Sequence, residues 1–305
     1  MIKGYARAPA PLSSIFSPKI FKDSEPRSRP EEIGARGGGF TLADMVETWI
    51  ELEEGDGVEV FVNGEEMEFK PSIEAAETMK KLLGLRGSIR IEHRIRAPLG
   101  AGFGTSASAA FTVITLLSRI SGHGITMLEA CRLTHEIELS CRTGLNSEAG
   151  LLSEGLILVL REGAPPRLRI DSIPLPPSIR LIAVAAGALE TSRILGDPRR
   201  LREVEEIGDK ILDRILEKPT PERFLAGARR FAFEAGFVTR EVEEIFEELE
   251  RLPTLGYAQN MIGNAAHALV EVKDLRLVED RLRQVFPDHQ VFSAELGHGV
   301  KVSAR

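Results

Sequence analysis

The order of apolar and polar residues divides the chain into strand-like and helix-like segments. Residues 89–95, Ile-Arg-Ile-Glu-His-Arg-Ile, alternate strictly, as a strand with one buried face does. The run from Ser106 to Ile120 is mostly apolar and long enough for a buried helix. The pattern also predicts strands at residues 41–53, 57–62, 66–69, 156–160 and 180–186, and helices at residues 73–83, 126–142, 199–216, 221–235 and 238–249.

The remaining segments define the ends and the middle of the chain. Residues up to Phe21 form an extended segment, Gly34–Gly39 a loop, and residues 291–302 two short strands joined by a glycine turn. Five prolines between residues 165 and 177 favour a linker, because proline cannot continue a strand ladder. We therefore expect an α+β fold with two domains, residues 1–170 and 171–305.

Composition narrows the class of protein. Of the 305 residues, 43% are hydrophobic and 28% are charged, which is typical of a soluble globular protein. No apolar run approaches 18 residues and no cleavable signal is present at the N-terminus, so we expect a cytoplasmic protein that does not enter a membrane. The net charge of −7 argues against a nucleic-acid-binding surface. Cys131 and Cys141 lack the spacing of a zinc site or a disulfide framework and are expected to be buried thiols.

The most informative stretch runs from Pro98 to Ala109, between the alternating strand and the apolar helix. Gly100, Gly102 and Gly104 allow a phosphate to approach the main chain, and the helix that follows offers free N–H groups. A branched side chain at Gly104 is expected to stand where the phosphate approaches. The stretch lacks the lysine of a Walker loop and the setting of a dinucleotide fingerprint. A glycine-rich connection that only lets a helix pack closely on a sheet is the alternative.

This stretch resembles the phosphate loop of the GHMP kinases, whose pattern is P-x-x-x-G-[LIFY]-G-[ST]-S-A. The resemblance implies the two-domain GHMP kinase fold with the active site between the domains, and ATP bound at the loop. The residues implied in nucleotide binding are Pro98, Gly100, Ala101, Gly102, Phe103, Gly104, Thr105, Ser106 and Ala107.

Further blocks make the chain most similar to the archaeal pantoate kinases of coenzyme A biosynthesis. Residues 8–18 resemble that family's P-x-H-I-T-x-F-F start, and residues 34–40 its G-S-x-G-x-G loop. Residues 135–147 follow H-x-x-E-x-x-x-x-T-G-L-G-D, and residues 257–264 follow S-Q-x-M-x-G-N. Residues 295–300 also match, so the resemblance covers nearly the whole chain.

The matched positions imply roles. Ser106 and Glu138 are the implied Mg²⁺ ligands and catalytic residues, in keeping with the preference of Mg²⁺ for oxygen ligands. A solvated carboxylate on the helix face is the alternative for Glu138, and Glu136 is the expected bystander. His135 is implied in substrate binding, with a core or capping histidine as the alternative. Thr191 matches a threonine that the family uses for substrate.

Several pocket positions depart from the family pattern. Ala35 replaces the loop serine, Pro11 the N-terminal histidine, Ser147 the motif aspartate and Val159 an arginine. Arg161 lies two residues after Val159, on the same face of a regular strand, and is expected to stand in for that arginine.

Arg36, beside the altered loop position, is a second candidate cation. Ser147 keeps the catalytic position, because phosphoryl transfer depends chiefly on positioning and charge neutralisation rather than on a strong base. Glu148 takes over the task of the aspartate only if the backbone turns it inward.

The resemblance therefore implies an ATP- and Mg²⁺-dependent kinase of small hydroxy acids, with pantoate as the leading acceptor and a homodimer as the assembly. The altered pocket leaves two alternatives open. One is a GHMP kinase for another hydroxy acid or a polyol, and the other is a nucleotide-binding homologue without catalysis.

Overall fold

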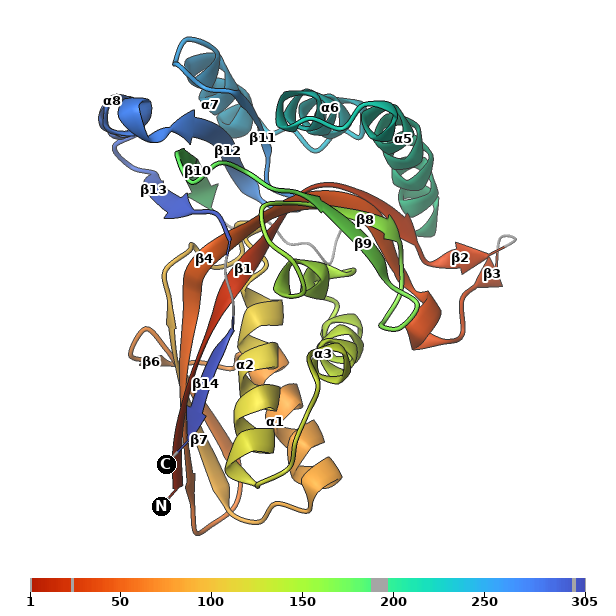
Figure 1. Cartoon of the computed structure of the whole chain (residues 1–305), viewed down its shortest axis with the longest axis vertical. Coiled ribbons are helices and arrows are strands. Elements are labelled where there is room, and N and C mark those ends of the chain that lie inside the picture. The colour runs from red at the N-terminus through yellow and green to blue at the C-terminus, as the bar shows by residue number, and fades with distance from the viewer. Residues whose placement is uncertain (1, 23–24, 188–196, 298–299, 305) are drawn as a thin grey trace.

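Two β-sheets organise the computed structural model, which describes residues 2–22, 25–187, 197–297 and 300–304 (Figure 1). Strands β1 (Ile2–Lys19) and β4 (Gly34–Glu53) form the long antiparallel centre of the first sheet. Its strand order is β14-β1-β4-β7-β5-β6, and β8 also pairs with β4 and carries β9. The bounds are Val58–Val62 for β5, Glu65–Glu66 for β6, Ser88–Ile95 for β7, Leu156–Arg161 for β8, Arg169–Ile173 for β9 and Lys301–Ala304 for β14.

The second sheet is antiparallel and has the order β11-β12-β10-β13. Its strands are β10 (Ile179–Gly187), β11 (Gly256–Gln259), β12 (Asn264–Glu271) and β13 (Gln290–Glu295). A short β2 (Phe21–Lys22) and β3 (Glu25–Pro26) form a separate ribbon.

Three helices cover one face of the first sheet, as Figure 1 shows: α1 (Lys70–Leu83), α2 (Thr105–Ile120) and α3 (Met127–Cys141). Helix α2 packs against β1, β4, α1 and α3 and is buried over most of its length. Short 3₁₀ turns form at η1 (Pro30–Glu32) and η2 (Ser147–Leu151). The location of α2 within the core fixes its N-terminal end.

Four helices belong to the second half of the described chain: α5 (Pro198–Glu217), α6 (Pro221–Glu234), α7 (Arg240–Glu250) and α8 (Val272–Val285). Side chains of α7 and α8 bury one face of the second sheet around Ile182 and Val184. The other face, with Leu181 and Ala183, joins the larger core. Because Phe40 meets Phe224 in that core at a ring distance of 5.7 Å, the core spans both halves of the chain. A domain division at residue 170 stays a prediction.

The elements confirm the α+β expectation and correct some details. Gly34–Gly39 is not a loop but the start of β4. A Cβ at Gly37 or Gly39 would lie 2.2 Å from the Ile15 carbonyl oxygen or 1.9 Å from that of Leu12, so these glycines serve close passage along β1.

Other corrections concern strands and helices. The strand predicted at 66–69 is reduced to Glu65–Glu66, and β13 and β14 lie in different sheets instead of pairing around a glycine turn. Strands β9, β11 and β12 and helix α8 were not predicted. None of the described helices has the length and apolarity to cross a membrane.

Candidate active site

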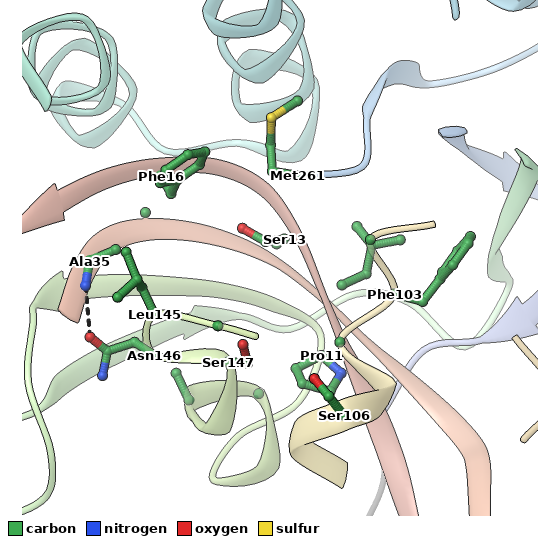
Figure 2. A pocket seen from close by; sticks show the side chains of 18 of the residues that line it. Pro11, Ser13, Phe16, Ala35, Phe103, Ser106, Leu145, Asn146, Ser147 and Met261 are labelled. Atoms are coloured by element: carbon green, nitrogen blue, oxygen red, sulfur yellow. Dashed lines mark hydrogen bonds between the residues drawn. The ribbon is translucent and has the colours of Figure 1, made fainter. Parts of the chain in front are cut away.

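A cavity of about 360 Å³ opens where β1, β4, the N-terminal end of α2 and residues 142–150 meet (Figure 2). Ser13, Phe16 and Met261 form one side, and Ser106 and Ser147 lie on the opposite side. Much of the remaining wall is apolar and includes Leu12, Ile15, Phe40, Leu145, Ile157, Val159 and Ile262. The predicted phosphate loop thus lies at the edge of a largely apolar cavity.

The loop has the backbone expected of a phosphate cradle. Gly100, Gly102 and Gly104 have φ values of 72°, 79° and 66°, which favour glycine. Gly104 is the N-cap of α2 and supplies no side-chain cap, so N–H groups of the first turn are available to a ligand. Six of the nine predicted nucleotide-binding residues line the cavity, namely Gly100, Gly102, Phe103, Gly104, Thr105 and Ser106. Pro98, Ala101 and Ala107 do not line it.

Gly104 differs from its sequence interpretation in one respect. A Cβ at this position would lie 2.2 Å from the Pro11 carbonyl oxygen. A side chain at Gly104 would therefore collide with β1 behind the loop rather than project into the phosphate site.

Glu138 joins the loop to helix α3. Ser106 Oγ and Thr143 Oγ1 donate hydrogen bonds of 2.6 Å and 2.7 Å to Glu138 Oε1. Burial raises the pKa of Glu138, against the lowering effect of the Ser106, Ser147 and Thr143 hydroxyls. Because Glu138 is fully buried, the alternative of a solvated helix-face carboxylate is wrong. Glu136 is partly exposed and pairs with Arg132 instead.

Ser147 lies beside this pair. A Cβ at Gly144 would lie 2.1 Å from Glu138 Oε2 and 2.3 Å from Ser147 Oγ, so glycine lets the backbone pass both groups. Glu138 Oε2 is buried beside the Ser147 hydroxyl. An acceptor oxygen is thus held close to the loop, with two serine hydroxyls nearby.

Two arginines of the described residues line the cavity, and they differ in their ion pairing. Arg36 forms ion pairs with Asp209 at 2.9 Å and Asp213 at 2.7 Å, on helix α5. Arg142 is exposed at the C-cap of α3 and forms no ion pair with any carboxylate of the described residues. Arg142 was not predicted as a site residue, although it directly precedes Thr143 in a matched block.

Arg161 does not reach the cavity. It is exposed, and its Nε donates to the Arg167 carbonyl oxygen at 2.7 Å, whereas Val159 lines the cavity. The β8–β9 pairing shifts register between Val159 and Arg161, so the two-residue period used to place Arg161 fails there.

His135 is buried beneath the site and does not line it. Nδ1 lies 3.0 Å from Glu148 Oε1, and Nε2 lies 3.0 Å from the Ile33 carbonyl oxygen. Burial alone disfavours the charged ring, but Glu148 and the carbonyls outweigh it and raise the pKa of His135. The geometry favours the core histidine over the substrate-binding one. Thr191 lies outside the described residues.

Asn146 ties the altered positions together. Its Oδ1 accepts from the Ala35 N–H at 2.9 Å, the bond drawn in Figure 2, and its Nδ2 donates to Glu148 Oε1 at 2.8 Å. Glu148 is fully buried and does not line the cavity. It therefore does not replace the missing aspartate.

Comparisons with known proteins agree with these motifs. Residues 72–151 match the family described as "GHMP kinases N terminal domain". The chain is 29% identical over 268 residues to the pantoate kinase of Thermococcus kodakarensis, covering 86% of each chain. It superposes with a TM-score of 0.84 and 25% identity on a solved "Phosphotransferase related to CoA biosynthesis pathway", covering 99% of this chain and 98% of the other.

A more distant structure shares the fold. It was solved as "MDDEF in complex with MVAPP, AMPPCP and Magnesium" and gives a TM-score of 0.72 at 14% identity, covering 100% of this chain and 99% of the other. The expected fold and both sequence resemblances are confirmed.

Proposed function

We propose that this chain, whose residues 72–151 form a GHMP kinase N-terminal domain, is an ATP-dependent kinase that phosphorylates a small hydroxy acid. One arrangement carries the proposal: the uncapped N-terminal end of α2 and the buried Ser106–Glu138 pair meet at the edge of one cavity. A helix N-terminus binds anions, and a buried carboxylate beside it suits a divalent cation rather than a phosphate alone.

The residues fit the nucleotide and its metal ion. The triphosphate would lie along Gly102–Ser106, where positive φ values and free N–H groups meet. Ser106 Oγ and Glu138 would hold Mg²⁺, and the buried Oε2 of Glu138 would supply a hard oxygen ligand. Bound Mg²⁺ supplies charge neutralisation on the phosphates. Thr143 and Gly144 orient the carboxylate, by a hydrogen bond and by close backbone passage.

Pantoate is the acceptor we favour, because similar proteins are pantoate kinases. The two methyl groups of pantoate suit the apolar wall around Phe16, Ile157 and Val159. Its carboxylate needs a cation, since burying an unpaired anion is costly. Arg142 has no carboxylate partner among the described residues, so we assign this contact to Arg142 before Arg36.

The transfer step depends on positioning. Ser147 lines the cavity where the pantoate kinase pattern has aspartate, whereas Glu148 does not line it and contacts His135 and Asn146 through Oε1. Neither supplies a carboxylate base in the cavity. We propose that the acceptor hydroxyl is oriented by Ser147 and that transfer relies on alignment and charge neutralisation.

A different acceptor is the second candidate, and the lining favours it at specific points. Ala35 and Val159 place no polar side-chain group in the cavity, and Arg36 is engaged by α5. Another hydroxy acid or a polyol then takes the place of pantoate.

A nucleotide-binding homologue without catalysis is the third candidate. A homodimer and a cytoplasmic location stay predictions.

A coupled ADP-release screen over hydroxy acids and polyols tests the proposal. Pantoate is expected to give the highest turnover, and Glu138→Gln serves as the blank because it removes the charge but keeps the size. Turnover on another acceptor alone supports the second candidate. ATP binding without turnover on any acceptor supports the third.

A further inference from the structure

A series of hydrogen bonds runs through the core behind the cavity. Ser14 Oγ lies 3.0 Å from His267 Nε2, and His267 Nδ1 lies 2.8 Å from Asn260 Oδ1. Asn260 Nδ2 then donates to the Ala101 carbonyl oxygen at 3.2 Å. The three side chains are fully buried and do not line the cavity, so none of them touches a ligand there.

The donor and the acceptor in each hydrogen bond follow from the Ala101 carbonyl group at the end of the series. A carbonyl oxygen only accepts, so the amide nitrogen of Asn260 faces Ala101 and its oxygen faces His267. His267 Nδ1 therefore donates, and Nε2 accepts from the Ser14 hydroxyl. This requires a neutral ring, and burial lowers the pKa of His267 to about 3. Each polar group in the series thus has one fixed partner and one fixed role.

The series joins the two sides of the cavity. Ala101 belongs to the phosphate loop, whereas Ser14 lies between Ser13 and Ile15, which line the opposite wall. The Met261 N–H donates to the Ser13 carbonyl oxygen at 2.8 Å, next to Asn260.

The turn after β11 also contacts the loop directly. A Cβ at Gly263 would lie 2.3 Å from the Ala101 carbonyl oxygen, and one at Gly102 would lie 3.0 Å from Asn260 Cβ. The loop therefore rests on this turn, and the turn is oriented through β12 by Ser14 of β1.

We propose that Ser14, His267 and Asn260 are positioning residues that hold the phosphate loop at a fixed distance from the cavity wall formed by Ser13 and Ile15. The inference rests on the proposed nucleotide site, and none of the three residues contacts the nucleotide. Directional hydrogen bonds suit this task better than apolar packing. A buried polar group left unpaired is costly, so the loop has one low-energy position. A fixed spacing matters because transfer requires the reacting atoms to be aligned.

Binding of a non-hydrolysable ATP analogue, followed by calorimetry, tests the inference without any acceptor. Asn260→Ala removes the bond to Ala101 and should weaken binding about 10-fold, as expected for one lost buried hydrogen bond. Ser14→Ala leaves Asn260 in place and should weaken it less, by about 3-fold. His267→Asn keeps a donor toward Asn260 and should bind more tightly than Asn260→Ala. Val270→Ala is the matched control. It removes buried volume from β12, the strand of His267, but on the other face of the sheet.

The control should lower the melting temperature and leave the affinity unchanged. If Asn260→Ala lowers the melting temperature but binds the analogue as tightly as the wild type, the three residues are merely structural and the inference is wrong. Ser14→Ala decides in the same way should Asn260→Ala fail to fold. A wild-type protein that binds no analogue contradicts the nucleotide site itself, so the two failures are distinguishable.

Discussion

Ser106 on helix α2 and Glu138 on helix α3 are 32 residues apart in the sequence, and Ser106 Oγ donates a 2.6 Å hydrogen bond to Glu138 Oε1. Glu138 is fully buried, and its second oxygen lies beside the Ser147 hydroxyl. A buried carboxylate charge is costly to desolvate, and a bound cation relieves that cost. The pair therefore makes sense as half of a binding site completed by a ligand.

Replacing either member of this pair should abolish most activity. We expect Ser106→Ala and Glu138→Gln each to lower kcat by ~10²-fold or more, because charge stabilisation of the transferring phosphoryl group is lost. Glu136→Gln is the control, since Glu136 lies on the same helix but pairs with Arg132. Steady-state ADP release at saturating ATP and Mg²⁺ checks this. Near wild-type turnover in either variant removes that residue from the site.

Arg142 and Arg161 separate the structural assignment from the sequence-based one. We expect Arg142→Gln to raise the acceptor KM by ~10-fold, because a charge-assisted contact to the carboxylate is lost. Arg161→Gln should leave both KM values unchanged, since Arg161 is exposed and engaged with the Arg167 carbonyl. Initial rates at varied acceptor and varied ATP measure both. A raised ATP KM in Arg142→Gln instead assigns this arginine to the phosphates.

Buried histidines should make the fold sensitive to acid. Burial lowers the pKa of His93 to about 3, and its ring nitrogens lie 2.8 Å and 2.7 Å from the Thr48 and Ser72 hydroxyls. The unfolded chain takes up this proton near pH 6.5, so the stability contributed by neutral His93 is complete above that pH and is lost as the pH falls toward 3.

His135 has the opposite sign. Its pKa is raised, so its contribution to stability is complete below the ordinary value and is lost as the pH rises through the raised pKa.

We expect His93→Gln to flatten the decline of the melting temperature between pH 7 and pH 4, because the variant lacks the buried neutral ring. The surface variant His123→Gln should decline as steeply as the wild type. Parallel slopes for all three proteins would contradict the role of His93.

Local patterns predicted the parts of the site that are contiguous in sequence. Glycine spacing predicted the phosphate loop, and the family resemblance implied Ser106 and Glu138. Ser106 lines the cavity and donates a hydrogen bond to Glu138. The bounds of α2 and α3 were also predicted to within a residue or two.

What failed depends on tertiary context. A register shift in β8 keeps Arg161 away from the cavity. The choice between a substrate-binding and a core His135 depends on Glu148 and two carbonyls, which contact its ring. The Ser14–His267 contact joins residues 253 positions apart, which no local pattern reveals. Residues 34–39 suggested a loop because glycine is common in loops. The structure shows that these glycines instead allow β1 to pass close to β4.

Ser147 offers the sharpest test of the acceptor. Its hydroxyl lies next to Glu138, where the pantoate kinase pattern has an aspartate. If pantoate is the substrate, Ser147→Asp should raise pantoate turnover by ~10-fold, because a positioned carboxylate can orient and deprotonate the attacking hydroxyl. The new carboxylate lies beside Glu138, so the gain should require saturating Mg²⁺ to offset like-charge repulsion.

The double variant Ala35→Ser/Ser147→Asp restores two altered positions that Asn146 already links through the Ala35 N–H. We expect its pantoate turnover to equal or exceed that of Ser147→Asp, and ADP release for the three proteins measures this. A pocket built for another acceptor predicts the reverse, since a second carboxylate repels the substrate anion or the γ-phosphate and lowers activity on the true acceptor. Pantoate-dependent release that is absent from all three proteins rules pantoate out as the substrate, whatever the nucleotide affinity.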